Sequence, residues 1–170
     1  MIPEIKKILY ATDLSKNSAY AFFYAADMAK RHGASIVMLH SVEPGHPISY
    51  AGSMVERMVK NARKEEQEED VEEIKKGLEE FCKKVEPQAG HACLALVSKI
   101  LVPLGHPVEE ILKIADEESC DAIVLGTHGK GWLKQTFLGS VACSVLERTR
   151  KPVFVIPLPS EKTTIDWDKI

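Results

Sequence analysis

The sequence lacks the features that mark secreted, membrane-bound or nucleic-acid-binding proteins. No apolar run reaches the length of a signal peptide or a membrane span. The net charge is only −3 at pH 7, and the Lys and Arg residues are spread along the whole chain. We therefore expect a cytoplasmic protein that binds neither membranes nor nucleic acid.

The sequence also lacks a cysteine motif for metal or redox chemistry. Cys82, Cys93, Cys120 and Cys143 are widely spaced, with no C-x-x-C pair and no histidine cluster at metal-ligand spacing. Cys93 and Cys143 fall within predicted core elements, and none of the four belongs to a nucleophile constellation. We expect small buried residues in a reducing compartment.

What the chain does contain is a regular alternation of strand and helix signals. A length of 170 residues fits one domain, predicted over residues 1–159, with a short charged tail over residues 160–170. Apolar runs predict strands over residues 8–11, 35–42, 91–103, 122–125 and 153–156. Capping residues and apolar stripes predict helices over residues 15–33, from the box Ser53-x-x-Glu56, over 71–85, 107–119 and 137–149. The charged stretch 63–70 is interpreted as a solvated helix turn rather than a partner-binding tail.

The alternation predicts an α/β fold with an open, Rossmann-like parallel sheet and helices on both faces. Strands that are apolar throughout are typical of sheets buried on both sides. We expect the strand order 3-2-1-4-5, for which a ligand binds at the carboxyl ends of strands one and four. Those ends are Ala11-Thr12-Asp13 and the segment 126–129.

The glycine-rich segment 126–131, Gly-Thr-His-Gly-Lys-Gly, fails the common phosphate fingerprints. A Walker loop needs Lys after its last glycine, but Trp132 follows Gly131. The dinucleotide pattern needs a third glycine or alanine where Lys134 stands. Neither a P-loop nor a Rossmann-type NAD or FAD site is supported.

The chain does contain a glycine pattern with a longer spacing. Gly126-x-x-Gly129 is followed after nine residues by Gly139-Ser140, close to a predicted helix start. The chain resembles the ATP-binding branch of the universal stress protein family, whose signature is G-x2-G-x9-G-[S/T]. The resemblance extends over about residues 5–157, including the opening KKILYATDLS and the close KPVFVIP.

The resemblance implies a site for ATP, or for ADP or AMP, with Mg²⁺ or Mn²⁺ held through the phosphates. The phosphate tail would lie at the helix that begins near Ser140, because free amides and the positive dipole end stabilise anions. Asp13 is expected to serve polar recognition or to support the metal, and Val42 matches a position whose backbone meets the adenine. Relatives commonly carry Pro where Ala11 stands. The candidate nucleotide-binding residues are Ala11, Thr12, Asp13, Val42, Leu125, Gly126, Thr127, His128, Gly129, Gly139, Ser140 and Val141.

The last strand, Val153–Ile156, is apolar, and an open sheet edge of this kind invites pairing. The resemblance implies a homodimer in which the closing strands of two subunits pair antiparallel. Pro157 and Pro159 would limit how far that pairing runs. No other protein partner is indicated.

Three functions remain open at this point. We favour a nucleotide-dependent stress-response or signalling module with slow or no hydrolysis, because no set of residues typical of a fast ATPase is present. The second is a slow ATPase or an adenylate-transferring enzyme in which His128 or Asp13 assists a metal-bound phosphate, although no H-x-G-H motif accompanies it. The third is a nucleotide-free interaction protein, against which the intact signature weighs.

Overall fold

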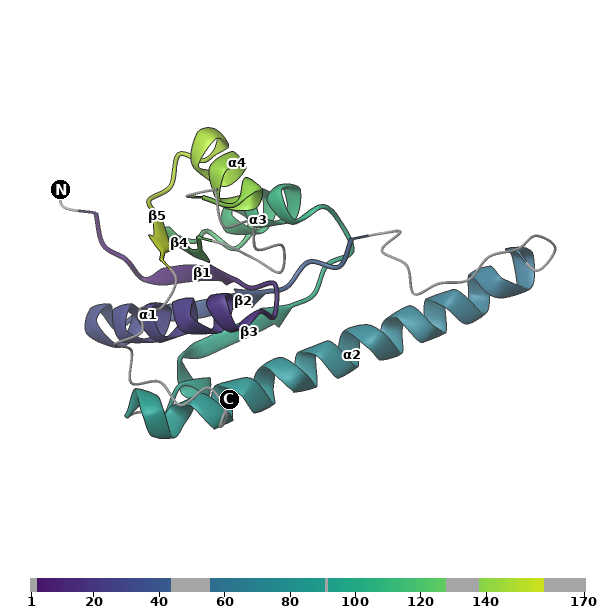
Figure 1. The fold of residues 1–170 in the computed structure, drawn as a ribbon, viewed down its shortest axis with the longest axis horizontal. Helices are drawn as coiled ribbons and strands as arrows, with labels where there is room; N and C mark the ends of the chain where they lie inside the picture. Colours follow the sequence, from purple (N-terminus) through teal and green to yellow (C-terminus); the bar gives the residue numbers. More distant parts are fainter. Residues whose placement is uncertain (1–2, 44–55, 91, 128–137, 158–170) are drawn as a thin grey trace.

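A computed structural model describes residues 3–43, 56–90, 92–127 and 138–157. Five parallel strands form one sheet in the order β3-β2-β1-β4-β5 (Figure 1). This order confirms the predicted fold class. The strands are β1 (Lys7–Ala11), β2 (Ser35–Leu39), β3 (Val97–Leu101), β4 (Ala122–Gly126) and β5 (Val153–Ile156).

The central strand β1 is paired on both sides. Leu9 lies opposite Val37 of β2 and opposite Ile123 of β4. Ile8, Leu9 and Tyr10 are fully buried, because helices cover both faces of the sheet. This is the physical reason why the segment is apolar without alternation.

Two helices pack on each face of the sheet. Side chains of α1 (Lys16–His32) and α2 (Glu56–Ala89) join one apolar cluster, and those of α3 (Pro107–Glu117) and α4 (Ser140–Arg148) join the other. A short 3₁₀ turn, Leu94–Leu96, precedes β3. No helix within the described ranges is long and apolar enough to cross a membrane.

Helix α2 departs most from the sequence prediction. It runs unbroken from Glu56 through the charged stretch and through Pro87 to Ala89, and its first half projects beyond the sheet (Figure 1). A proline inside a helix usually ends or kinks it, and Pro87 lies beyond the predicted range 71–85. It lies close enough to the end that the helix closes with a bond from Gly90 N to Glu86 O, 3.0 Å. The buried face of Leu78, Cys82 and Val85 holds this part of the helix in the core.

Other predicted boundaries moved by a few residues. The second strand ends at Leu39 rather than at residue 42, and only Val42 forms an isolated bridge further on, with Leu104. The third strand begins at Val97, because the 3₁₀ turn occupies part of the predicted range. The helix-start residue Ser53 and the predicted tail, residues 160–170, lie outside the described residues.

Two helices end in the same backbone conformation with different residues. Gly33 follows α1 at φ 64°, and Ala34 N donates to Ala29 O. Ser119 follows α3 at φ 53°, and Cys120 N donates to Ala115 O. A left-handed residue at this position favours glycine.

Exchanging these residues should therefore change stability in opposite directions. We expect Ser119→Gly to raise the free energy of unfolding by about 0.5–1 kcal/mol, and Gly33→Ser to lower it by about 1 kcal/mol. A Cβ at Gly33 would meet no atom within 4 Å, and Ser119 is exposed, so both effects are conformational. Urea unfolding of the two variants measures this, and changes of the same sign would contradict it.

Candidate functional site

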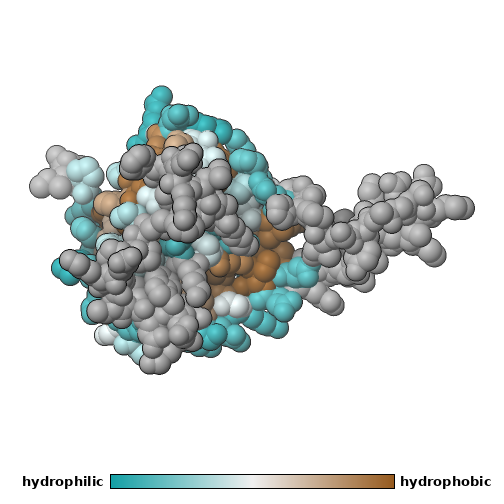
Figure 2. Space-filling model, viewed as in Figure 1, coloured by the Kyte–Doolittle hydropathy of each residue, from teal (hydrophilic) through white to brown (hydrophobic). Residues whose placement is uncertain are grey.

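A cavity of about 340 Å³ opens at the carboxyl ends of β1, β2 and β4. This volume lies in the range of small-molecule sites, roughly 300–1,000 Å³. Hydrophobic residues are visible near this edge of the molecule, with hydrophilic residues around them (Figure 2). The lining residues are Ala11, Thr12, Asp13, Ser18, Leu39, His40, Ser41, Pro107, Ile111, Leu125, Gly126, Thr127, Gly139, Ser140, Val141 and Ala142.

Most of the residues nominated from the sequence come together here. Nine of them line the cavity: Ala11, Thr12, Asp13, Leu125, Gly126, Thr127, Gly139, Ser140 and Val141. Val42 does not line it, and its main-chain groups are bonded nearby. Val42 N donates to Pro103 O, and Val42 O accepts from Gly105 N, both at 2.9 Å. His128 and Gly129 lie outside the described residues.

Sequence reasoning missed the wall formed by the end of β2 and the start of α3. His40 and Ser41 line the cavity because β2 ends at Leu39 and the next two residues lie at its tip. The sequence prediction extended that strand to residue 42, and it therefore placed the carboxyl end of the strand after these two residues. Pro107 was recognised as a helix start, but its place beside the cavity depends on how α3 packs on the sheet.

The tip of β1 is held by side-chain and main-chain bonds. Thr12 N donates to Leu39 O at 2.9 Å, and Ser15 N donates to Asp13 Oδ1 at 3.0 Å. Ser15, the first residue of the predicted helix range 15–33, is the N-cap of α1 and accepts from Ser18 N. One carboxylate oxygen of Asp13 thus organises the turn, while the side chain still borders the cavity.

Ser18 connects this tip to the core beneath it. Its side chain is buried, lies 2.8 Å from Thr12 Oγ1 and donates to Ser15 O at 2.9 Å. Tyr10 Oη donates to Ser18 O at 2.7 Å, and burial raises the pKa of Tyr10 far above its ordinary value. Tyr10 therefore acts as a neutral hydrogen-bond donor, and the network fixes the floor of the cavity.

Helix α4 directs its amino end at the cavity. Gly139, not Ser140, is the N-cap residue, and Gly139 N is already bonded to Thr127 O at 2.6 Å. The first bond along the helix runs from Cys143 N to Gly139 O, 3.0 Å. The amides of Ser140, Val141 and Ala142 precede it, so no carbonyl of the helix can accept from them. With no acidic residue in the first turn, this end suits an anion.

The start of α3 is less suited to an anion, although it also borders the cavity. Pro107 has no N–H to donate, and the first turn already carries Glu109 and Glu110. Glu109 is bound by Arg148 of α4, whose guanidinium lowers the pKa of that carboxyl. The α4 end of the cavity therefore favours a negatively charged group, and the α3 end does not.

The described part of the chain holds no group of three or more His, Cys, Asp or Glu side chains that could bind a metal ion. Asp13 is the acidic residue among those that line the cavity.

Comparison with known proteins shows which family shares this sequence and architecture. The model of the universal stress protein family matches residues 4–157. Universal stress protein MJ0577 of Methanocaldococcus jannaschii is 32% identical over 165 residues, covering 89% of this chain and 94% of that protein. A solved structure of MJ0577 matches with a TM-score of 0.72 and 30% identity, over 94% of this chain and 100% of that one.

A second solved structure is a universal stress protein of Archaeoglobus fulgidus in complex with dAMP. It is 24% identical, with a TM-score of 0.56, and the match covers 92% of this chain and 99% of that one. At this identity the likeness concerns the fold.

The cysteines stand apart from the cavity. Cys82, Cys93 and Cys120 are buried, as we expected of small core residues, and Cys143 is partly buried. Burial raises the pKa of Cys82 to about 12 and those of Cys93 and Cys120 to about 11. At neutral pH these three thiols are protonated and shielded.

We expect iodoacetamide at pH 8 to modify Cys143 well before the other three cysteines in the native protein. The thiolate is the reactive form, and burial denies it to Cys82, Cys93 and Cys120. Peptide mass spectrometry over a time course gives the rate at each site, with urea-unfolded protein as the control. Equal rates at all four sites in the native protein would contradict the prediction.

Proposed function

Because the chain belongs to the universal stress protein family, we propose that it binds an adenine nucleotide, ATP in the first place and otherwise ADP or AMP. The binding site is the cavity at the carboxyl ends of β1, β2 and β4. The observation that carries this proposal is the amino end of α4, whose first amides face a cavity with an apolar opposite wall. The dAMP complex of the Archaeoglobus fulgidus relative supports an adenine nucleotide as the class of ligand.

The phosphates are assigned to α4. Ser140, Val141 and Ala142 line the cavity, and their amides precede the first intrahelical bond. The amides of Thr12 and Thr127 are bonded to Leu39 O and Ile156 O, so they hold the strand tips together. Of the described main-chain groups at the cavity, the first amides of α4 are therefore the donors to which we assign the phosphates.

The base is assigned to the opposite wall. Leu39 is buried at the end of β2, and Pro107 and Ile111 of α3 border the cavity beside it. Such a slot suits a flat heterocycle. Asp13 lies at the tip of the strand between the two walls, where the ribose of a bound nucleotide would pass.

Mg²⁺ or Mn²⁺ would be held chiefly by the phosphate oxygens. Asp13 is the carboxylate at the cavity that could add a ligand directly or through water. The ion would offset the phosphate charge at the mouth of the site.

We assign the protein a role as a nucleotide-dependent stress-response or signalling module of the cytoplasm. Occupancy of the cavity would fix the tips of β1 and β4 relative to α4, and this would change the surface offered to partners. Slow or absent hydrolysis fits this role, since the nucleotide then acts as a signal and not as a substrate.

We also propose that the protein is a homodimer paired through β5. Ile123 N donates to Pro152 O and Thr127 N donates to Ile156 O, so alternate residues of the strand face β4. Val153 and Val155 then direct their main-chain groups to the open edge. An apolar strand with such an edge is a template for a second copy.

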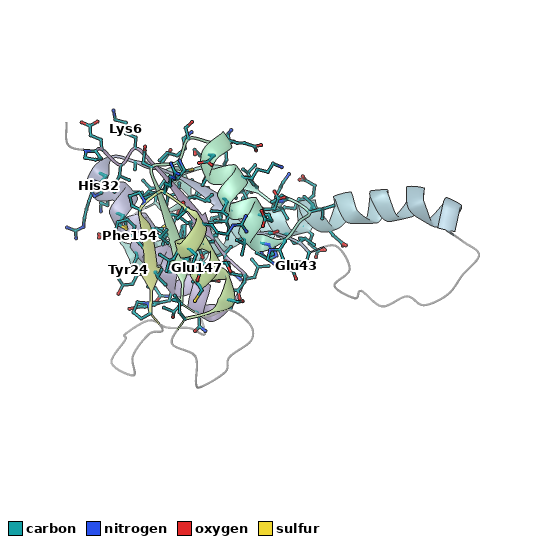
Figure 3. The ribbon with its side chains drawn as sticks, turned by 90° about the horizontal axis from the view of Figure 1, so that it is seen from above. Lys6, Tyr24, His32, Glu43, Glu147 and Phe154 are labelled. Atoms are coloured by element: carbon teal, nitrogen blue, oxygen red, sulfur yellow. The ribbon has the colours of Figure 1, made fainter. Side chains whose placement is uncertain are left out.

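Aromatic side chains flank that edge. Phe154 is 37% exposed and Tyr24 of α1 is 43% exposed. Figure 3 shows both on the same side of the molecule, opposite Glu43. Burying them between two subunits would add apolar contact area to the main-chain pairing.

The phosphate assignment predicts that a negative charge at Ser140 weakens nucleotide binding. Ser140→Asp should weaken ATP binding about ten-fold or more, because the carboxylate competes with phosphate for the same amides and repels it. The substitution should not lower the melting temperature, since Asp in the first turn favours the helix. Isothermal titration calorimetry with MgATP measures the affinity.

Ser140→Asn is the matched control, because it has nearly the same shape without the charge. We expect it to reduce the affinity only a few-fold. Absence of saturable ATP or ADP binding to the nucleotide-stripped wild-type protein would refute the proposed function. Equal losses in the two variants would refute the placement of the phosphates.

For the dimer, we expect Phe154→Asp to yield monomers at concentrations at which the wild type is dimeric, because two buried carboxylates would face each other. Leu104→Asp is the control, since Leu104 is also exposed, at 49%, but lies in the segment after β3, the strand at the opposite edge of the sheet. Light scattering coupled to size-exclusion chromatography gives the mass. A monomeric wild type, or a dimeric Phe154→Asp variant, would contradict the proposal.

A further inference from the structure

The apolar end of the cavity contains a hydroxyl group that sequence reasoning did not nominate. Ser41 follows the end of β2 and lines the cavity with Leu39, Pro107 and Ile111. Its Oγ donates to Gly105 O at 2.5 Å. The proton of this hydroxyl is therefore committed to the protein.

The acceptor of that bond is held in place from two directions. Gly105 N donates to Val42 O at 2.9 Å, so both polar groups of Gly105 are bonded to the segment after β2. The Cα of Gly105 packs against the Glu110 side chain, since an added Cβ would lie 2.5 Å from Glu110 Oε1. The carbonyl that takes the Ser41 proton is thus fixed by the fold.

A serine whose proton is committed can only accept a hydrogen bond from a ligand. At the other polar side chain of this end, His40, Nδ1 lies 2.8 Å from Thr12 O and donates to it, so Nε2 of the neutral ring can only accept a hydrogen bond. This wall of the cavity therefore offers Ser41 lone pairs within apolar surroundings. It favours a ligand edge with an N–H donor and disfavours one with a carbonyl oxygen, because two facing lone pairs repel and the buried carbonyl is left unpaired.

We propose that Ser41 is a specificity-determining residue that accepts a hydrogen bond from the 6-amino group of the purine. The site then selects 6-aminopurine nucleotides over 6-oxopurine nucleotides such as those of hypoxanthine and guanine. This inference rests on the proposed nucleotide-binding function and adds the basis of its choice of base. The hydrogen bond from Ser41 Oγ to Gly105 O sets the direction of the Ser41 lone pairs, and these lone pairs select the base.

The test compares MgATP with MgITP, in which a 6-oxo group replaces the 6-amino group and N1 carries a hydrogen. Calorimetry on the nucleotide-stripped wild type should give an affinity for ATP at least about ten-fold higher than for ITP. In Ser41→Ala the ATP affinity should fall about five- to ten-fold, while the ITP affinity stays unchanged or rises. The preference between the two nucleotides then nearly disappears.

Ser98→Ala is the matched control. Ser98 Oγ also donates to a main-chain carbonyl, Ile36 O at 3.1 Å, but Ser98 is not among the residues that line the cavity. This variant should keep the wild-type affinities for both nucleotides. Melting temperatures of the three proteins show that each is folded.

The outcomes separate this inference from the proposed function. A wild type that binds neither nucleotide refutes the function itself. A wild type that binds both equally, or a Ser41→Ala variant that loses ATP and ITP to the same degree or keeps the wild-type preference, overturns the role of Ser41 and leaves nucleotide binding standing.

Discussion

Main-chain pairing of β1 with β2 on one side and with β4 on the other is the constraint on which the rest of the structure depends. A strand placed between two others and buried on both faces must bond its polar backbone groups along the sheet, and its side chains must be apolar. Consecutive strands are added away from β1 in one direction and then, from β4 onward, in the other. The chain therefore leaves β1 through α1 on one face and returns to β4 through α3 on the opposite face, and the cavity opens where these paths separate.

The chemistry of the cavity follows from how its polar groups are used. At the strand tips, the amides of Thr12 and Thr127 bond to carbonyls of neighbouring strands and make the edge rigid. Within the described residues, the groups that can bond a ligand include the first amides of α4 at one end and the Ser41 lone pairs at the other. A molecule with a polyanion at one end and an N–H donor on an apolar ring at the other matches this arrangement.

Local sequence signals predicted the parts of the fold that depend on nearest neighbours. The apolar runs became strands, Ser15 capped α1, and Gly33 closed it in the left-handed conformation. Predictions failed where packing over a distance decided the outcome. Pro87 has a strong local preference to end a helix, yet α2 continues to Ala89 because its apolar side is held in the core.

The sequence by itself determined the order of elements, the family resemblance and nine of the residues that line the cavity, because glycine spacing and strand-end residues are local features. Only the tertiary structure decided which side of each strand tip faces the ligand. The main-chain groups of Val42 are hydrogen-bonded to Pro103 and Gly105, and Val42 does not line the cavity. Ser41 lies at the cavity wall instead. The physical reason is that the hydrogen-bond partners of these residues lie in a loop about sixty residues away along the chain. The packing of the ends of β2 and β3 decides which partners meet, and the neighbouring sequence does not.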